Sequence, residues 1–267
     1  RILFHFHAVA NDKGVSDALG GIAGLFLIKM LAALRGIDAQ RSVFDAEHNL
    51  RADFSFFTAL AWDSKTCGQM AWACPMRLSS TDSGLWYSRA RSIWGSRDYM
   101  FPAFASGKSL AQGKVSDFAD RPASNYFVLR FLQEVVQVYR LFTLDDAKRL
   151  RRHSFRHFIA NCMKILRKPM EDRFEGARWR DSQVMPLRYA EETKFITSVN
   201  VLRILLIDIH SAVARVPIDK WPVFGGWELL LPPEDRDSAC ELPDVFDQQQ
   251  DDLSPCCETV CDDSDDD

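Results

Sequence analysis

One segment of the sequence gathers basic and imidazole side chains within a helical pattern. The stretch 148-KRLRRHSFRHF-158 holds two histidines and five Lys or Arg residues, yet apolar residues continue through it as far as Leu166. Their spacing from Phe155 onward predicts one core-facing helical stripe. His153 and Arg156 are three residues apart, so they lie on one flank of that helix and can face the same ligand. An imidazole beside a guanidinium is suited to binding a phosphate.

Other residues that can act on a phosphodiester stand before and after this pair. Upstream, Arg35 lies at the end of a predicted helix, Asp38 follows it by three residues, and Lys65 occupies a predicted turn. Downstream, Trp179 stands ten positions before Tyr189. In chain order, the set is Arg35, Lys65, His153, Arg156, Trp179 and Tyr189.

This order and spacing resembles the catalytic domain of the tyrosine recombinases (the phage-integrase family), which share their active-site design with type IB topoisomerases. The resemblance runs from about Leu25 to Leu206. Its boxes are 35-RGID-38, 153-HSFRH-157 and 188-RYAEE-192, and Trp179 takes the position that holds His or Trp in the family. Two features depart from the family: the interval from Trp179 to Tyr189 is one residue longer than usual, and Asp38 replaces the commoner Glu.

The resemblance implies DNA strand cleavage and rejoining through a 3′-phosphotyrosine. Tyr189 would be the nucleophile, and because a phenol has a pKa near 10 it needs cationic surroundings to react as phenolate. Arg35 and Arg156 would clamp the non-bridging oxygens in two-point geometry. The remaining groups would assist the same phosphate: His153 and the indole of Trp179 as hydrogen-bond donors, Lys65 as the acid that protonates the leaving 5′-oxygen, and Asp38 as the group that orients Arg35 or His153.

The leading hypothesis is site-specific DNA recombination or integration by a protein derived from a mobile element, without cofactor or metal. Double-stranded DNA is the expected partner, and a homo-oligomer on DNA is compatible with this function. The expected location is the nucleus in a eukaryote and the cytoplasm otherwise, and secretion is not expected. Two alternatives stay open: a DNA-binding protein on a recombinase scaffold that does not cut, and a type IB topoisomerase-like enzyme. Taken singly, Arg35 also fits a cation at a helix C-terminus, and Lys65 fits a surface turn.

Periodicity predicts a mainly α-helical fold with a small antiparallel β-sheet, an α+β class. Ser16 is expected to cap a buried helix over 17–34 that ends at Gly36. The other predicted elements are a short helix over 38–44, strands over 54–62 and 69–74 joined by a turn at 63–68, and helices over 126–142, from after Thr143 to 166, and over about 192–213. The alternation in 4-FHFH-7 is typical of a strand or extended segment. Residues 76–123 are placed only as loops and short helices.

Charge divides the chain into a basic body and an acidic end. Residues 234–267 hold fourteen Asp or Glu and one Arg, whereas residues 1–233 hold 32 Lys or Arg against 23 acidic residues. We therefore expect a recombinase-like catalytic domain over 1–232 and an acidic, disordered tail over 233–267. The first residue is Arg1, so the sequence is expected to be a piece of a longer protein.

Cysteine usage argues against a disulfide-framework protein, and hydropathy argues against a membrane-spanning protein. The seven cysteines are odd in number, and the three outside the acidic tail are scattered in apolar surroundings, which indicates a reducing compartment and not a disulfide framework. Zinc binding by the four tail cysteines is an alternative, although they form no C-x2-C pair. The most apolar run, 22–36, is interrupted by Lys29 and is shorter than the roughly 20 apolar residues that span a bilayer. No membrane association is therefore expected.

Overall fold

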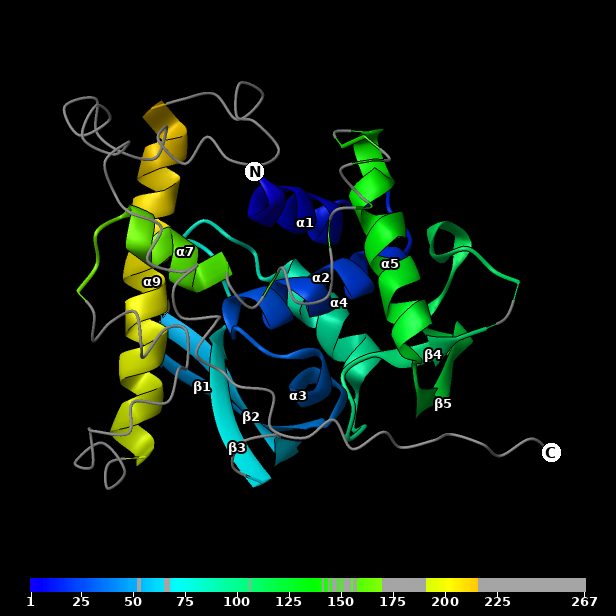
Figure 1. Cartoon of the computed structure of the whole chain (residues 1–267), viewed down its shortest axis with the longest axis horizontal. Helices are drawn as coiled ribbons and strands as arrows, with labels where there is room; N and C mark the ends of the chain where they lie inside the picture. Colours follow the sequence, from blue (N-terminus) through cyan, green and yellow to red (C-terminus); the bar gives the residue numbers. More distant parts are fainter. Residues whose placement is uncertain are drawn as a thin grey trace, which may run out of the picture. The chain divides into compact units, whose positions relative to one another are not determined.

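The computed structural model describes residues 1–51, 54–64, 68–105, 107–140, 142–143, 145, 148, 150, 155, 158–169 and 191–215. All of them belong to the first of the two units into which the chain divides, Arg1–Leu230 and Leu231–Asp267. The described part combines helices with a three-stranded antiparallel sheet and a two-stranded antiparallel sheet (Figure 1). The predicted α+β class is therefore confirmed.

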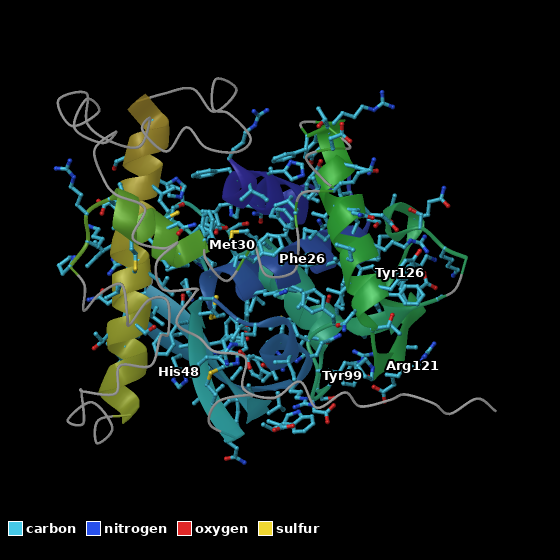
Figure 2. All side chains as sticks on the ribbon, in the orientation of Figure 1. Phe26, Met30, His48, Tyr99, Arg121 and Tyr126 are labelled. Atoms are coloured by element: carbon cyan, nitrogen blue, oxygen red, sulfur yellow. The ribbon has the colours of Figure 1, made fainter. Side chains whose placement is uncertain are left out.

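Helix α2 (Asp17–Leu31) is enclosed by other helices, and every one of its residues after Asp17 is buried. It contacts α1 (Ile2–Asn11), α4 (Leu85–Trp94), α5 (Asn125–Gln137) and α7 (Phe158–Ile165). Figure 2 shows Phe26 and Met30 of α2 among the packed side chains. Ser16 caps the helix as predicted, because its hydroxyl oxygen accepts a hydrogen bond from the N–H of Leu19 at 3.1 Å. The apolar character of α2 on all sides follows from this enclosure.

The close approach of α4 to α2 requires glycine at two positions. A Cβ atom at Gly24 would lie 2.5 Å from the carbonyl oxygen of Trp86, and one at Gly21 would lie 2.4 Å from Cδ1 of Ile93. Both distances are well below van der Waals contact, so any side chain at these positions would push the helices apart. Glycine weakens a helix by itself, and here it permits the packing.

The end of α2 differs from the prediction. The predicted helix ran to residue 34 with Gly36 as its cap, but α2 ends at Leu31, and Gly36 is the first residue of α3 (Gly36–Gln40). Ala33 takes the left-handed conformation instead, with φ of 48°, and the N–H of Leu34 donates to the carbonyl of Lys29 at 3.0 Å. This closure satisfies a carbonyl group in the last turn, although an alanine in this conformation costs roughly 1–2 kcal/mol.

The larger sheet is a meander of β1 (Ser42–Arg51), β2 (Phe54–Ser64) and β3 (Gly68–Pro75). The predicted hairpin is confirmed, because β2 and β3 pair in antiparallel register up to Ser64 and Gly68. Strand β1 was missed, and the helix predicted over 38–44 is wrong beyond Gln40. The sequence 42-SVFDAEHNLR-51 has few apolar residues, so this strand depends on its pairing with β2 and not on a pattern of its own.

Residues 76–123, predicted only as loops and short helices, contain regular structure. Helix α4 buries Trp86 and Trp94 completely. Strand β4 (Pro102–Phe104) pairs with β5 (Phe118–Pro122), and two short 3-10 helices, η1 (Leu110–Gln112) and η2 (Val115–Asp117), lie between them in the chain. The scattered tryptophans of this region are therefore core residues of an ordered layer.

A buried carboxylate links this region to α1. Asp82 accepts hydrogen bonds from the Trp86 indole at 2.9 Å and from the N–H groups of Leu78 and Gly84 at 2.7 Å and 2.9 Å. Nε2 of His7 lies 3.0 Å from the same carboxylate. Burial favours the neutral acid, but the hydrogen bonds from His7, Leu78 and Gly84 outweigh it and lower the pKa of Asp82 to about 2.

The extended segment predicted for 4-FHFH-7 is wrong, since these residues lie inside α1. The residues buried along α1 include Leu3, Phe6 and Val9, which recur at intervals of three, and this stripe places the helix on α2. His5 is also buried, with Nε2 2.9 Å from the carbonyl oxygen of Val135. The alternation over four residues was too short to outweigh the helical period.

The helices predicted over 126–142 and 192–213 are confirmed with other bounds. Helix α5 ends at Gln137, before the 3-10 turn η3 (Val138–Arg140), where Tyr139 has φ of 61°. Helix α9 (Glu191–Arg215) contacts β3. Of the helix predicted from after Thr143 to 166, the continuous part described is α7, which holds a free, buried Cys162 whose thiol pKa is raised to about 12 by burial. Among the described helices, none has the length and apolar character needed to cross a membrane.

Candidate active site

Two of the predicted site residues, Arg35 and Asp38, stand at the start of α3. The backbone N–H of Arg35 donates to Oδ2 of Asp38 at 3.2 Å, as the acidic residue of a capping box does. The hydroxyl of Ser42 donates to the carbonyl of Asp38 at 2.6 Å. Asp38 therefore fixes the backbone from which the Arg35 side chain leaves, while its predicted role toward the side chains of Arg35 or His153 stays a prediction.

The other carboxylate oxygen of Asp38, Oδ1, accepts no hydrogen bond from the described residues. Asp38 is 1% exposed, and its Oδ1 has no hydrogen-bond partner among the residues that the structure describes. Leaving a buried acceptor unsatisfied costs about 1–3 kcal/mol, and more when it is charged. A donor that reached this oxygen would therefore be held firmly, close to the backbone of Arg35.

Phe155, in the middle of the second box, contacts the last turns of α2. Its ring is 2% exposed, its centroid lies 5.6 Å from that of Phe26, and the Nζ of Lys29 lies 5.9 Å from the ring centre. The carbonyl of Lys29 in turn accepts the N–H of Leu34, the residue before Arg35. The described part of the second box and the first box therefore lie at the same end of α2.

The sheet brings a third part of the predicted site to this neighbourhood. Helix α3 contacts β2, and the N–H of Trp62 donates to the carbonyl of Arg41 just after α3 at 2.9 Å. The Arg41 guanidinium lies 5.5 Å from the Trp62 ring centre and pairs with Asp63. Strand β2 continues from there only to Ser64, where it pairs with Gly68 at the start of β3, and Lys65 itself lies outside the described residues.

Five of the six predicted catalytic residues lie outside the described part of the chain: Lys65, His153, Arg156, Trp179 and Tyr189. Their convergence with Arg35 on one pocket stays a prediction. Sequence reasoning missed Lys29, which it treated only as an interruption of an apolar run. This lysine is almost completely buried, and a charged residue inside a helix that is apolar on all sides was the available indication, since a buried ammonium needs partners.

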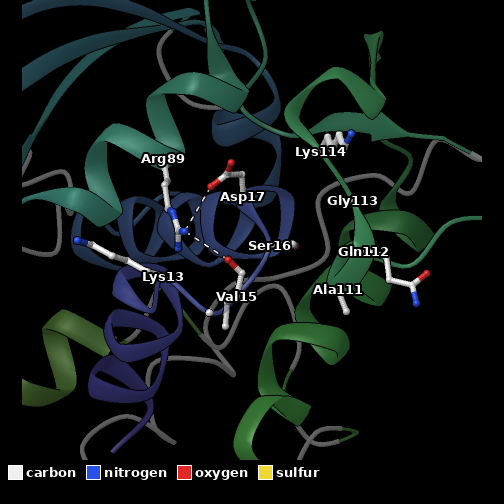
Figure 3. A pocket seen from close by; sticks show the side chains of 10 residues that line it. Lys13, Val15, Ser16, Asp17, Arg89, Ala111, Gln112, Gly113 and Lys114 are labelled. Carbon is white, nitrogen blue, oxygen red and sulfur yellow. Dashed lines mark hydrogen bonds and ion pairs between the residues drawn. The ribbon is translucent and has the colours of Figure 1, made fainter.

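A separate pocket of about 450 Å³ lies at the beginning of α2 (Figure 3). It is lined by Lys13–Asp17, Arg89 and Ala111–Lys114. Arg89 donates to the carbonyls of Ala10, Asp12 and Val15 at 3.2, 2.8 and 3.3 Å and pairs with Asp17. Its guanidinium therefore closes the turn between α1 and α2, and the pocket contains none of the predicted site residues.

The described residues hold no cluster of three or more His, Cys, Asp or Glu side chains arranged to bind a metal ion. The tail cysteines considered for zinc lie outside these residues. Comparisons of the chain with protein-family models, with curated proteins and with solved structures found no match.

Proposed function

We propose that this chain cleaves and rejoins DNA strands through a 3′-phosphotyrosine, as the tyrosine recombinases do, in site-specific recombination or integration. The observation that carries the proposal is the contact of Phe155 with the end of α2. Phe155 is two residues from His153 and one from Arg156. Lys29, whose Nζ lies over the Phe155 ring, accepts a backbone hydrogen bond from Leu34, the residue before Arg35. Groups far apart in the sequence thus have neighbours that meet, as a shared phosphate site requires.

The proposed reaction begins when Tyr189, after losing its phenol proton to solvent, attacks the phosphorus of a phosphodiester as phenolate. The bond from phosphorus to the 5′-oxygen breaks, the leaving oxygen takes a proton from Lys65, and the 3′-phosphate stays bound to Tyr189. Arg35 and Arg156 neutralise the charge that develops on the non-bridging oxygens. Rejoining reverses these steps with a new 5′-hydroxyl, so the tyrosine ester conserves the energy of the broken bond and no nucleotide is consumed.

Two features beside Arg35 support this arrangement. The unsatisfied Oδ1 of Asp38 is a ready acceptor for the guanidinium of Arg35 or the imidazole of His153. Strand β2 ends at Ser64 and β3 begins at Gly68, on the side of the sheet where β2 contacts α3, so we expect a lysine between these strand ends to reach a phosphate held near Arg35.

The test is covalent capture on DNA. The chain is incubated with a library of nicked duplexes that carry a randomised segment, and adducts are separated by denaturing electrophoresis and sequenced. A nick beside the cleavage point lets the short 5′-hydroxyl fragment diffuse away, so the adduct accumulates. We expect an adduct with the wild-type chain and with the control Tyr126→Phe, whose ring lies on the surface of α5, but none with Tyr189→Phe, which loses one oxygen only.

The other outcomes separate the alternatives. DNA binding by the wild-type chain without any adduct identifies a binding protein that does not cut. An adduct that persists in Tyr189→Phe assigns the nucleophile to another residue. Adduct formation should be unchanged by EDTA, because cationic side chains supply the charge that a metal would otherwise supply.

A further inference from the structure

The outward face of α9 exposes large aliphatic side chains. Ile196, Ile204 and Ile207 are 40%, 48% and 54% exposed, whereas Leu205 on the inward face is completely buried. In Figure 1, α9 (yellow) stands at the edge of the described helices. Single exposed apolar residues are ordinary, but several on one side of a helix mark an interaction surface.

The exposed residues of α9 recur at alternating intervals of three and four. These residues are Thr197, Asn200, Ile204, Ile207, Ser211 and Ala214, and each of them is exposed. This alternation is the a/d pattern of a coiled coil, with Thr197, Ile204 and Ser211 at a and the other three at d. The stripe is aliphatic at its centre and polar or small toward its ends, and α9 is 25 residues long, enough for three heptads.

The residues beside this stripe favour one partner and one orientation. Arg203 directly precedes an a position and Asp208 directly follows a d position, which makes them g and e residues. In a parallel pair of identical helices, each g residue faces the e residue five positions later in the other helix. Arg203 of each copy therefore faces Asp208 of the other, and Ile196 faces Val201 one heptad earlier.

Both charged side chains are held at the margins of the stripe within their own chain. The Arg203 guanidinium lies 5.5 Å from the ring centre of Phe54 on one side, and Asp208 pairs with Lys168 on the other. An antiparallel pair of identical helices would instead bring like flanks together, with Arg203 facing the Arg203 and His210 side of the other copy. The charges thus match in the parallel orientation only.

We propose that α9 is a self-association surface on which a second copy of this chain docks in parallel, about a two-fold axis that runs along the helix. Ile204 and Ile207 pack against their own counterparts, and Arg203 and Asp208 form two reciprocal ion pairs. Asn200 meets its counterpart at a d position, where the two side-chain amides can hydrogen-bond to each other. The aliphatic centre spans only one heptad, so the dimer is weak and depends on concentration.

Sedimentation velocity of the whole chain over a wide concentration range tests the proposal. We expect a monomer–dimer equilibrium for the wild type and a monomer at every concentration for Ile204→Glu with Ile207→Glu. Leu50→Glu is the matched control, because Leu50 is as exposed as Ile207 but lies on β1, and it should leave the dimer unchanged. Circular dichroism and the unfolding midpoint of each variant confirm that the fold is intact.

Charge exchange tests the orientation. Arg203→Asp and Asp208→Arg each place like charges at both contacts, so each variant alone should dimerise about tenfold or more weakly. An equal mixture of the two variants should recover the dimer, because every contact then joins opposite charges. Lys168→Met, which removes only the bond inside the chain, should have no effect.

Three results would overturn the proposal. A wild-type chain that stays monomeric at all concentrations means that this face is left to solvent, to another segment of the chain or to a different protein. A dimer that survives the double isoleucine substitution uses another surface. A mixture of charge variants that dimerises no better than either variant alone excludes the parallel pair.

Discussion

Helices α2 and α9 are both rich in apolar residues, but the described structure surrounds only one of them. α2 contacts four other helices and has no exposed residue after Asp17, whereas α9 contacts β3 on one side and leaves Ile204 and Ile207 about half exposed on the other. An apolar helix therefore predicts contacts around its circumference, but it does not say whether the same chain or another one supplies them. Four measurements test this contrast, each made at low protein concentration.

The largest effect is expected where α2 is most tightly enclosed. Gly24→Val would place a side chain against the carbonyl oxygen of Trp86, where even a Cβ atom lies only 2.5 Å away. We expect the free energy of unfolding, measured with urea, to fall by about 3 kcal/mol or more. Asn200→Ala on the exposed face of α9 is the control and should change it by less than about 0.5 kcal/mol. An unchanged Gly24→Val protein would mean that α4 does not press on α2.

The two faces of α9 should differ nearly as much. Leu205→Ala truncates a completely buried side chain and should cost about 2–3 kcal/mol of unfolding free energy. Ile204→Ala removes the same number of carbon atoms from a half-exposed side chain and should cost less than about 1 kcal/mol. Urea unfolding of both variants measures the difference. Equal losses would show that α9 is enclosed like α2, and the comparison between the two helices would fail.

The free energy of unfolding should depend on pH through Asp82, which connects two of the helices that pack on α2, α1 and α4. The folded pKa of Asp82 is about 2, below its ordinary 3.8, so the unfolded chain binds the proton more readily and the carboxylate stabilises the fold above about pH 4. This contribution, about 2 kcal/mol, is lost as the pH falls through 2. Asp82→Asn should be less stable than the wild type at pH 6, and the difference should shrink toward pH 2. A difference that stays constant with pH would assign the loss to packing alone.

The smallest effect concerns the closure of α2. Ala33 is left-handed at φ of 48°, so Ala33→Gly relieves backbone strain but loses a buried methyl group and gives the unfolded chain more freedom. We expect a net gain of about 0.5 kcal/mol, seen as a rise of a few degrees at most in the midpoint of thermal unfolding. A loss of stability would show that the methyl contact matters more than the strain.

The sequence predicts those elements that have a local residue pattern. It does not predict elements whose structure depends on pairing or packing with distant residues. The hairpin follows from 54-FSFFTALAW-62 and the turn after it, because aromatic and alternating residues favour strands wherever they pair. Strand β1 has no such pattern and exists through β2, and the end of α2 depends on a left-handed alanine that no rule for helix ends favours. In α1, the alternation of 4-FHFH-7 favours a strand locally, but the stripe of Leu3, Phe6 and Val9 is buried and α1 packs on α2, so the segment is helical.

In the candidate site, too, local features can be predicted from the sequence and long-range contacts cannot. The position of Arg35 after a buried helix and of Asp38 three residues later is readable from the sequence. The contact of Phe155 with Phe26 and Lys29 is not, because it joins segments that are distant in the chain. The predicted convergence of the remaining site residues would depend on the same kind of packing, which spacing alone does not determine.

The buried thiol of Cys162 makes local opening of α7 measurable as a rate of chemical labelling. A cysteine reacts with alkylating reagents as the thiolate, and with a pKa raised to about 12 and almost no exposed surface it is protected in two ways while α7 stays in place. The thiol can be alkylated only when the helix opens. The alkylation rate, followed by mass spectrometry, therefore reports how often α7 opens. Because α7 begins just after the second box, each labelling event records an opening beside the proposed phosphate site, and DNA bound at that proposed site should slow the labelling.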